Sequence, residues 1–182
     1  MQRAIIVPPN LAGAALDELK DWLAINTPGD DVALFNMLHA ASETCEAFTG
    51  QMPVESECEQ ILPATRQWQG LASRPVQAVT ALESLDDDGT RLALDAADYE
   101  FELAADGTAC VRLLRTIEQA RLVVRFIAGL APDWDSLPSG LQHGILRLSA
   151  HNFRERDGAA AKASPPAAVA ALWQPWRRMR VT

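Results

Sequence analysis

The sequence lacks the residue patterns on which most disulfide, metal and nucleotide sites depend. Its three cysteines, Cys45, Cys58 and Cys110, are odd in number and widely spaced, and no Cys-x-x-Cys pair occurs. This spacing predicts neither a disulfide framework nor a zinc site, and it fits a reducing, cytoplasmic setting. No glycine-rich phosphate loop, Gly-x-Ser-x-Gly or His-Glu-x-x-His motif is present. We therefore expect no cofactor, no metal ion and no enzyme activity.

Long apolar runs and an excess of positive charge are missing as well. The N-terminal MQRAIIVPPN is too short in its apolar part for a signal peptide. No segment approaches the roughly 20 apolar residues of a membrane span. The chain has 24 acidic and 16 basic residues among 182, a net charge of −8. Such an acidic chain repels nucleic acid rather than holding it.

Isolated residues that could carry chemistry all have a simpler interpretation. His143 and His151 are eight residues apart, so they are no i, i+4 ligand pair, and His39 lies beside an apolar helical stripe. The acidic run 86–88 lacks the alternating ligands of a calcium loop and fits a hairpin turn. Cys45 falls on the apolar stripe, where we expect a core residue and no nucleophile.

Apolar periodicity predicts three long helices, over residues 14–25, 30–49 and 138–157. In the second, apolar residues recur at spacings of four, three, four and three from Leu34 to Phe48. The third carries Gly144, which costs about 1 kcal/mol relative to alanine in a helix. We expect this glycine to mark close packing against a neighbour.

Between about residues 57 and 127 the pattern changes to short runs rich in Val, Leu, Thr and aromatic residues. The predicted strands are 58–68, 76–85, 91–94, 99–103, 110–114 and 120–127. Two Asp-Gly pairs, at 88–89 and 106–107, predict hairpins. Pro63 favours an edge strand or a bulge for the first run, and residues 3–7 read as an edge strand or an extended arm. The prediction is an α+β fold, mainly a helical bundle, with a small antiparallel β-sheet inserted between the second and third long helices and a C-terminal tail helix.

The C-terminal end differs in composition from the rest. Residues 158–166 are small apart from Lys162 and include Pro165-Pro166, so they predict a linker between a body, 1–157, and a terminal segment, 167–182. After Gly158 there are four basic and no acidic residues, which leaves 12 basic and 24 acidic residues, or −12, on the preceding part. The segment either folds back onto its own core or docks on a partner, because Trp and Arg dominate interface energetics. The candidate partner-binding residues are Val169, Leu172, Trp173, Trp176, Arg177, Arg178, Met179 and Arg180.

Several stretches, in this order along the chain, carry a resemblance to a known family. They are LDELKDWLAI at 16–25, DDVALFNMLHAASETCEAFTG at 30–50, RPVQAVTALESLDDDG at 74–89, DYEF at 98–101, VVRFIAGL at 123–130, LPSGLQHGILRLSAHNFRERDG at 137–158 and WQPWRRMRV at 173–181. Together they resemble the head–tail connector (adaptor) proteins of tailed phages, including the adaptor of gene transfer agents. The order and spacing of the stretches carry this likeness, since no single motif is specific.

The resemblance implies a structural protein of the virion neck, made in the bacterial cytoplasm. Such proteins form a ring, usually of twelve copies, below the portal, through which DNA passes without specific binding. The ring links the capsid to a stopper or tail-side connector protein. The resemblance also implies that residues 167–182 contact the portal. The alternative is a cytoplasmic, non-enzymatic binding module that recruits one protein through its Trp/Arg tail.

Overall fold

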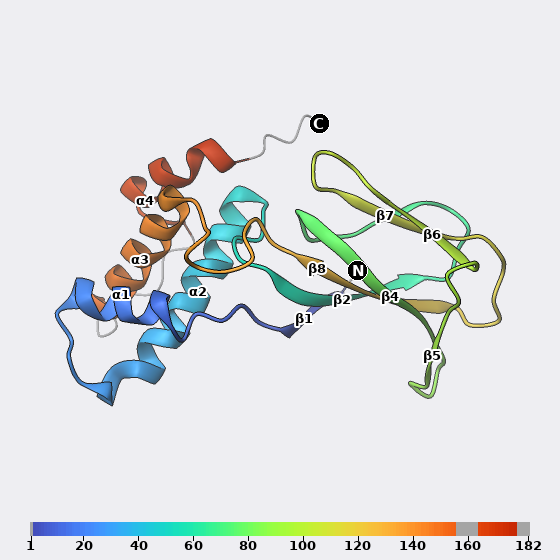
Figure 1. Ribbon diagram of the computed structural model, residues 1–182, viewed down its shortest axis with the longest axis horizontal. Coiled ribbons are helices and arrows are strands. Elements are labelled where there is room, and N and C mark those ends of the chain that lie inside the picture. Colours follow the sequence, from blue (N-terminus) through green and yellow to red (C-terminus); the bar gives the residue numbers. More distant parts are fainter. Residues whose placement is uncertain (1, 156–163, 178–182) are drawn as a thin grey trace. The chain divides into compact units, whose positions relative to one another are not determined.

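A computed structural model of the chain (Figure 1) describes residues 2–155 and 164–177. The chain forms two compact units, and each is built from segments that are distant in sequence. The β unit comprises Met1–Pro8 and Glu55–Gly129, and the helical unit comprises Pro9–Val54 and Leu130–Thr182. After an N-terminal strand, Gln2–Val7, the elements follow in the predicted order: two helices, then strands, then two helices.

Four α-helices make up the described part of the helical unit: α1 Ala14–Leu23, α2 Asp31–Thr49, α3 Ser139–Arg154 and α4 Ala167–Trp173. Two short 3-10 helices, η1 Pro28–Asp30 and η2 Gln174–Trp176, precede α2 and follow α4. The predicted stripe of α2 is buried at Leu34, Leu38, Ala41 and Cys45. Gly50 ends this helix in the left-handed conformation, at φ 73°, which glycine adopts without strain.

The β unit contains two antiparallel sheets rather than the one small sheet that we expected, so that prediction is wrong in extent. A five-stranded sheet has the order β1-β2-β8-β4-β5, and a three-stranded sheet has the order β3-β7-β6. The strands are β1 Gln2–Val7, β2 Ser56–Pro63, β3 Gln69–Gly70, β4 Val76–Leu85, β5 Arg91–Ala93, β6 Tyr99–Leu103, β7 Ala109–Leu113 and β8 Arg121–Ala128. Both Asp-Gly pairs form the predicted hairpins, which join β4 to β5 and β6 to β7.

The expectation that Pro63 marks an edge strand or a bulge is also wrong, because the pairing of β2 with β8 continues through Pro63 without a register shift. The run splits into β2 and β3, and β2 lies between β1 and β8 inside the five-stranded sheet. Pro63 is tolerated there because it is the last residue of β2, and the ladder between β1 and β2 ends earlier, at Gln2 opposite Ile61. The edge position belongs to β1 instead, as residues 3–7 had indicated.

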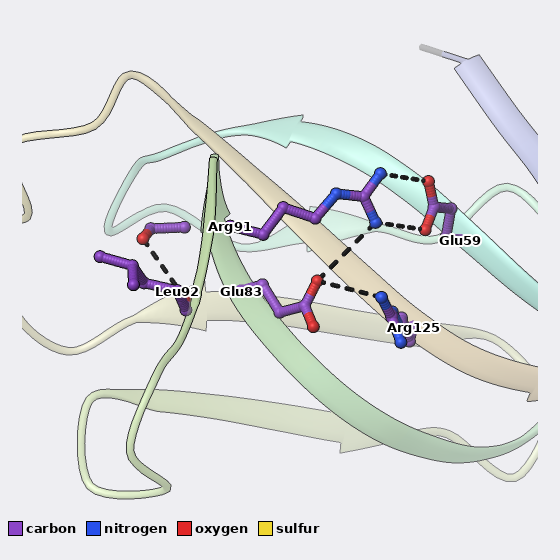
Figure 2. Close-up of polar contacts among 6 residues, drawn as sticks. Glu59, Glu83, Arg91, Leu92 and Arg125 are labelled. Atoms are coloured by element: carbon purple, nitrogen blue, oxygen red, sulfur yellow. Dashed lines mark hydrogen bonds and ion pairs between the residues drawn. The ribbon is translucent and has the colours of Figure 1, made fainter. Parts of the chain in front are cut away.

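One face of the five-stranded sheet carries four charged side chains whose signs alternate across the strands (Figure 2). Arg91 of β5 reaches over to β2, where its Nη1 and Nη2 donate to the two carboxylate oxygens of Glu59 at 2.8 and 2.9 Å. Between them, Glu83 Oε2 lies 3.8 Å from Arg91 and 3.4 Å from Arg125. The hydrogen bonds from Arg91 hold the pKa of Glu59 below its ordinary value. This group ties the three-residue strand β5 to the middle of the sheet.

We expect Arg91→Met, which keeps the apolar stem, to lower the free energy of unfolding by about 1 kcal/mol at neutral pH. The expected loss of stability is small because the Arg91 side chain is 35% exposed, so water partly screens its charge. The folded-state pKa of Glu59 is lowered, so the pair stabilises above the ordinary glutamate value and loses its effect as pH falls through the folded pKa. Urea denaturation of both proteins over a pH series measures this difference.

Arg121→Met serves as the matched control, because Arg121 pairs with the fully exposed Asp87 at 3.2 Å. Its effect should stay within about 0.5 kcal/mol at every pH. A constant difference between the wild type and Arg91→Met down to pH 3 would show that packing, and not the ion pair, is responsible.

Candidate functional site

The C-terminal helix α4 lies along α3 within the helical unit, as Figure 1 shows in red and orange. It begins after Pro166, whose carbonyl oxygen accepts hydrogen bonds from the amides of Val169 and Ala170. Val169 and Trp173 are one helical turn apart and therefore share a face. They are 3% and 0% exposed and belong to the same core as the buried residues of α1, α2 and α3.

Two glycines of α3 form the seat on which the tryptophans rest. A Cβ atom at Gly144 would lie 2.0 Å from Nε1 of Trp173, and one at Gly140 would lie 2.7 Å from Cη2 of Trp176. Real side chains do not approach so closely, so only glycine leaves room for the two rings. The indole Nε1–H of Trp173 points to the carbonyl oxygen of Leu141 at 3.5 Å. The neighbour that the sequence predicted for Gly144 is therefore Trp173.

The end of α2 holds the same segment from a second side. The ring of Phe48 lies 6.0 Å from that of Trp173, centre to centre and tilted by 50°. Gln51 Nε2 donates to the carbonyl oxygen of Trp176 at 2.6 Å. The Arg177 guanidinium lies 5.2 Å from the centre of the Phe48 ring, within the range of a cation–π contact. The segment is thus fixed as far as Arg177.

The five predicted partner-binding residues that the structure describes differ in exposure. Val169 and Trp173 are buried, Leu172 and Trp176 are half-buried, and Arg177 is exposed. Arg178, Met179 and Arg180 lie outside the described residues. Of the two alternatives for the terminal segment, folding back onto its own core is the one that this structure shows from 164 to 177. The exposed parts of Leu172, Trp176 and Arg177 are those that a partner could reach without displacing α4.

Sequence reasoning missed the residues that receive the segment. Gly140 and Gln51 were not singled out, and Phe48 was predicted only as the last residue of an apolar stripe. Gly140 and Gly144 stand four residues apart and therefore mark one bare face of a helix. The spacing of the two glycines, together with the two tryptophans three residues apart in the terminal segment, could have indicated that the tryptophan rings pack against this face of the helix. Nothing in the local sequence connected Gln51 with Trp176, 125 residues further on.

The other candidate residues occupy ordinary structural positions. Burial raises the pKa of the Cys45 thiol to about 12, so it stays protonated and weakly nucleophilic at neutral pH. Burial lowers the pKa of His39, whose ring packs 4.4 Å from that of Phe35. The described residues contain no group of three or more His, Cys, Asp or Glu side chains placed to hold a metal ion. Within the same residues, no helix combines the length and the apolar character that crossing a membrane requires.

Solved structures of gene transfer agent (GTA) particles contain chains that are similar to this one in fold. A chain in "Neck of empty GTA particle computed with C6 symmetry" matches with a TM-score of 0.78 and 25% identity. A chain in "Neck of native GTA particle computed with C12 symmetry" matches with a TM-score of 0.76 and 28% identity. A chain in "Virion of native gene transfer agent (GTA) particle" matches with a TM-score of 0.74 and 27% identity.

Each match covers 100% of this chain and 98% of the matched chain. They confirm the resemblance predicted from the sequence: the chain is similar to neck proteins of gene transfer agent particles. No protein-family model matches the sequence, and neither does any curated protein.

Proposed function

We propose that this protein is a structural head–tail connector (adaptor) in the neck of a phage or gene transfer agent particle. It forms a ring below the portal, links the capsid to the tail and lines the DNA channel. The observation that carries the proposal is the end-to-end match, since 98% of the neck chains finds a counterpart here. A neck with C12 symmetry among the matches supports a ring of twelve copies.

The charge of the chain is consistent with this role. Residues 1–158 carry −12, and a channel wall of the same sign as DNA lets the duplex slide without binding. The protein is structural rather than enzymatic in this proposal. It is made in the bacterial cytoplasm, and a stopper or tail-side connector follows it in the particle.

We assign portal binding to the C-terminal segment. Packing against Gly140 and Gly144 of α3 holds the first part of the segment in place. Val169 and Trp173 are buried there and are therefore not available to a partner. Leu172 and Trp176 then supply apolar contact, and Arg177, Arg178, Met179 and Arg180 supply the charged end. No acidic residue follows Gly158, so these arginines have no acid of their own segment to pair with. An acidic rim around a portal groove is the complementary surface.

Deleting the gene in a particle-producing strain tests the proposed role. We expect heads that carry a portal and lack tails, because nothing then joins the two parts. A reconstruction of complemented particles should place the chain between portal and tail. If deletion leaves tailed particles at the normal yield, the connector role is wrong.

Replacing Arg177, Arg178 and Arg180 by glutamine should slow association with the isolated portal by about tenfold or more at low salt and flatten its salt dependence. Charges at the rim of an interface mainly steer encounter. Stopped-flow or surface-binding kinetics over a salt series measures both effects. Arg147→Gln, an exposed arginine of α3, is the control and should change neither. An unchanged rate and salt slope in the triple variant would place these charges away from the portal, with a role facing DNA as the better explanation.

A further inference from the structure

The three-stranded sheet has two open edges of opposite character. Strand β6 lies at one edge and β3 at the other, with β7 between them. From 92 to 111, around β6, the chain has five acidic and no basic residues: Asp95, Asp98, Glu100, Glu102 and Asp106. From 60 to 82, around β3, it has two basic and no acidic residues: Arg66 and Arg74. We call Tyr99–Leu103 the acidic edge and residues 66–70 the basic edge.

The acidic edge presents both backbone groups and apolar side chains to the outside. Leu114 N donates to Asp98 O and Ala104 N donates to Thr108 O, so even-numbered residues of this stretch turn their backbone groups toward β7. The N–H and C=O groups of Tyr99, Phe101 and Leu103 therefore point away from β7. Phe101 and Leu103 are 44% and 42% exposed, although they stand opposite the buried Val111 and Ala109. This is an unprotected strand edge of the kind that pairs with another chain.

The basic edge offers a matching aromatic and a positive charge. Trp68 is 41% exposed, and Arg112 covers one side of its ring at 4.5 Å. Arg66 is exposed and makes no ion pair with any described residue. On the acidic edge, Glu100 is already paired with Arg112 at 2.7 Å, whereas the Glu102 carboxylate has no ion pair among the described residues. Each edge thus carries one exposed charge that its own chain leaves unmatched in that part of the structure.

We propose that the acidic edge of one copy binds the basic edge of the next copy, and that this contact closes the ring. Head-to-tail rings need two different, complementary surfaces on each copy. The two strand edges meet this requirement because they are the opposite edges of one sheet and differ in the sign of their charge. An acidic edge repels a second acidic edge, so two copies cannot pair through the same edge in a two-fold symmetric contact. The acidic edge also repels DNA. The inference rests on the proposed ring and names the surfaces that build it.

A charge swap tests the contact in the full-length protein. Glu102→Arg exchanges the unpaired negative charge of the acidic edge for a positive one that would face Arg66, and Arg66→Glu exchanges the positive charge of the basic edge for a negative one that would face Glu102. Each variant alone should self-associate about tenfold more weakly than the wild type in a concentration series by sedimentation velocity, because like charges then face each other. An equal mixture of the two variants should regain association, since each acidic edge again meets a basic one. The double variant, with both charges exchanged, should regain it alone.

Asp135→Arg, at an exposed position of the helical unit, is the control and should associate as the wild type does. Phe101→Asp should weaken association through the apolar part of the same edge. A cooperative thermal unfolding transition, measured for each variant, checks that the variant is folded. Three results would overturn the proposal: single variants that associate normally, a mixture that does not recover, or a wild type that stays monomeric throughout. The gene-deletion experiment is separate, because tailless heads support the connector role whichever surfaces join the copies.

Discussion

Trp173→Ala is expected to lower the free energy of unfolding by about 3–5 kcal/mol, the usual range for truncating a buried tryptophan. The side chain is 0% exposed and is packed between Gly144 of α3 and Phe48 of α2. Because the seat is helix backbone without a side chain, the surroundings cannot collapse far into the space that the indole leaves. Urea denaturation followed by far-ultraviolet circular dichroism measures the loss.

Trp22→Ala is the matched control for this substitution. Trp22 is 44% exposed and packs edge-on against His143 at 6.2 Å between ring centres. Its loss should cost under about 1 kcal/mol, as expected of a largely exposed side chain. If Trp173→Ala costs no more than Trp22→Ala, the terminal segment is not part of the core and docking on a partner becomes its main role.

Gly144→Ala should destabilise the protein by about 1–3 kcal/mol, the usual cost of overpacking a core. Two effects of opposite sign compete at this position. Alanine favours a helix over glycine by about 1 kcal/mol, but its Cβ would lie 2.0 Å from Trp173 Nε1. The buried indole cannot rotate into solvent, so we expect the steric cost to exceed the gain. Denaturant titration gives the net value.

A double-mutant cycle separates these two effects. In a protein that already carries Trp173→Ala, the added methyl group of Gly144→Ala meets no ring, so the substitution should become neutral or stabilising. The two changes should therefore be non-additive by about 1 kcal/mol or more. Gly29→Ala is the control, because a Cβ there has nothing within 4 Å. Additive effects in the cycle would mean that Trp173 does not rest on Gly144.

These stability changes also affect how the proposed portal binding can be tested. A loss of binding in Trp173→Ala would include the loosening of the segment itself, so it could not be assigned to a direct contact. Trp176 is the better probe, because it is half-buried and the far end of its ring lies over Gly140 of α3. Arg177 lies one residue further and is exposed.

Much of the fold could be predicted from local sequence. The stripe from Leu34 to Phe48 defined α2 because apolar residues at helical spacing must share one face. The pairs Asp88-Gly89 and Asp106-Gly107 defined two hairpins because the turns require positive φ, which is 90° and 80° at the glycines. The order of these elements was sufficient for the resemblance to neck proteins.

Periodicity shows which face of a segment is apolar, and it cannot show what covers that face. The sequence therefore left open whether Trp173 packs on its own core or on a partner, and only the seat at Gly144 decided it for the described residues. In the same way, strand order placed β2 inside its sheet although Pro63 favoured an edge. Arg91 and Glu59, 32 residues apart, met only because β5 and β2 belong to one twisted sheet. Each of these outcomes depends on contacts between distant segments, whose pairing is selected by the packing of the whole unit and not by local propensity.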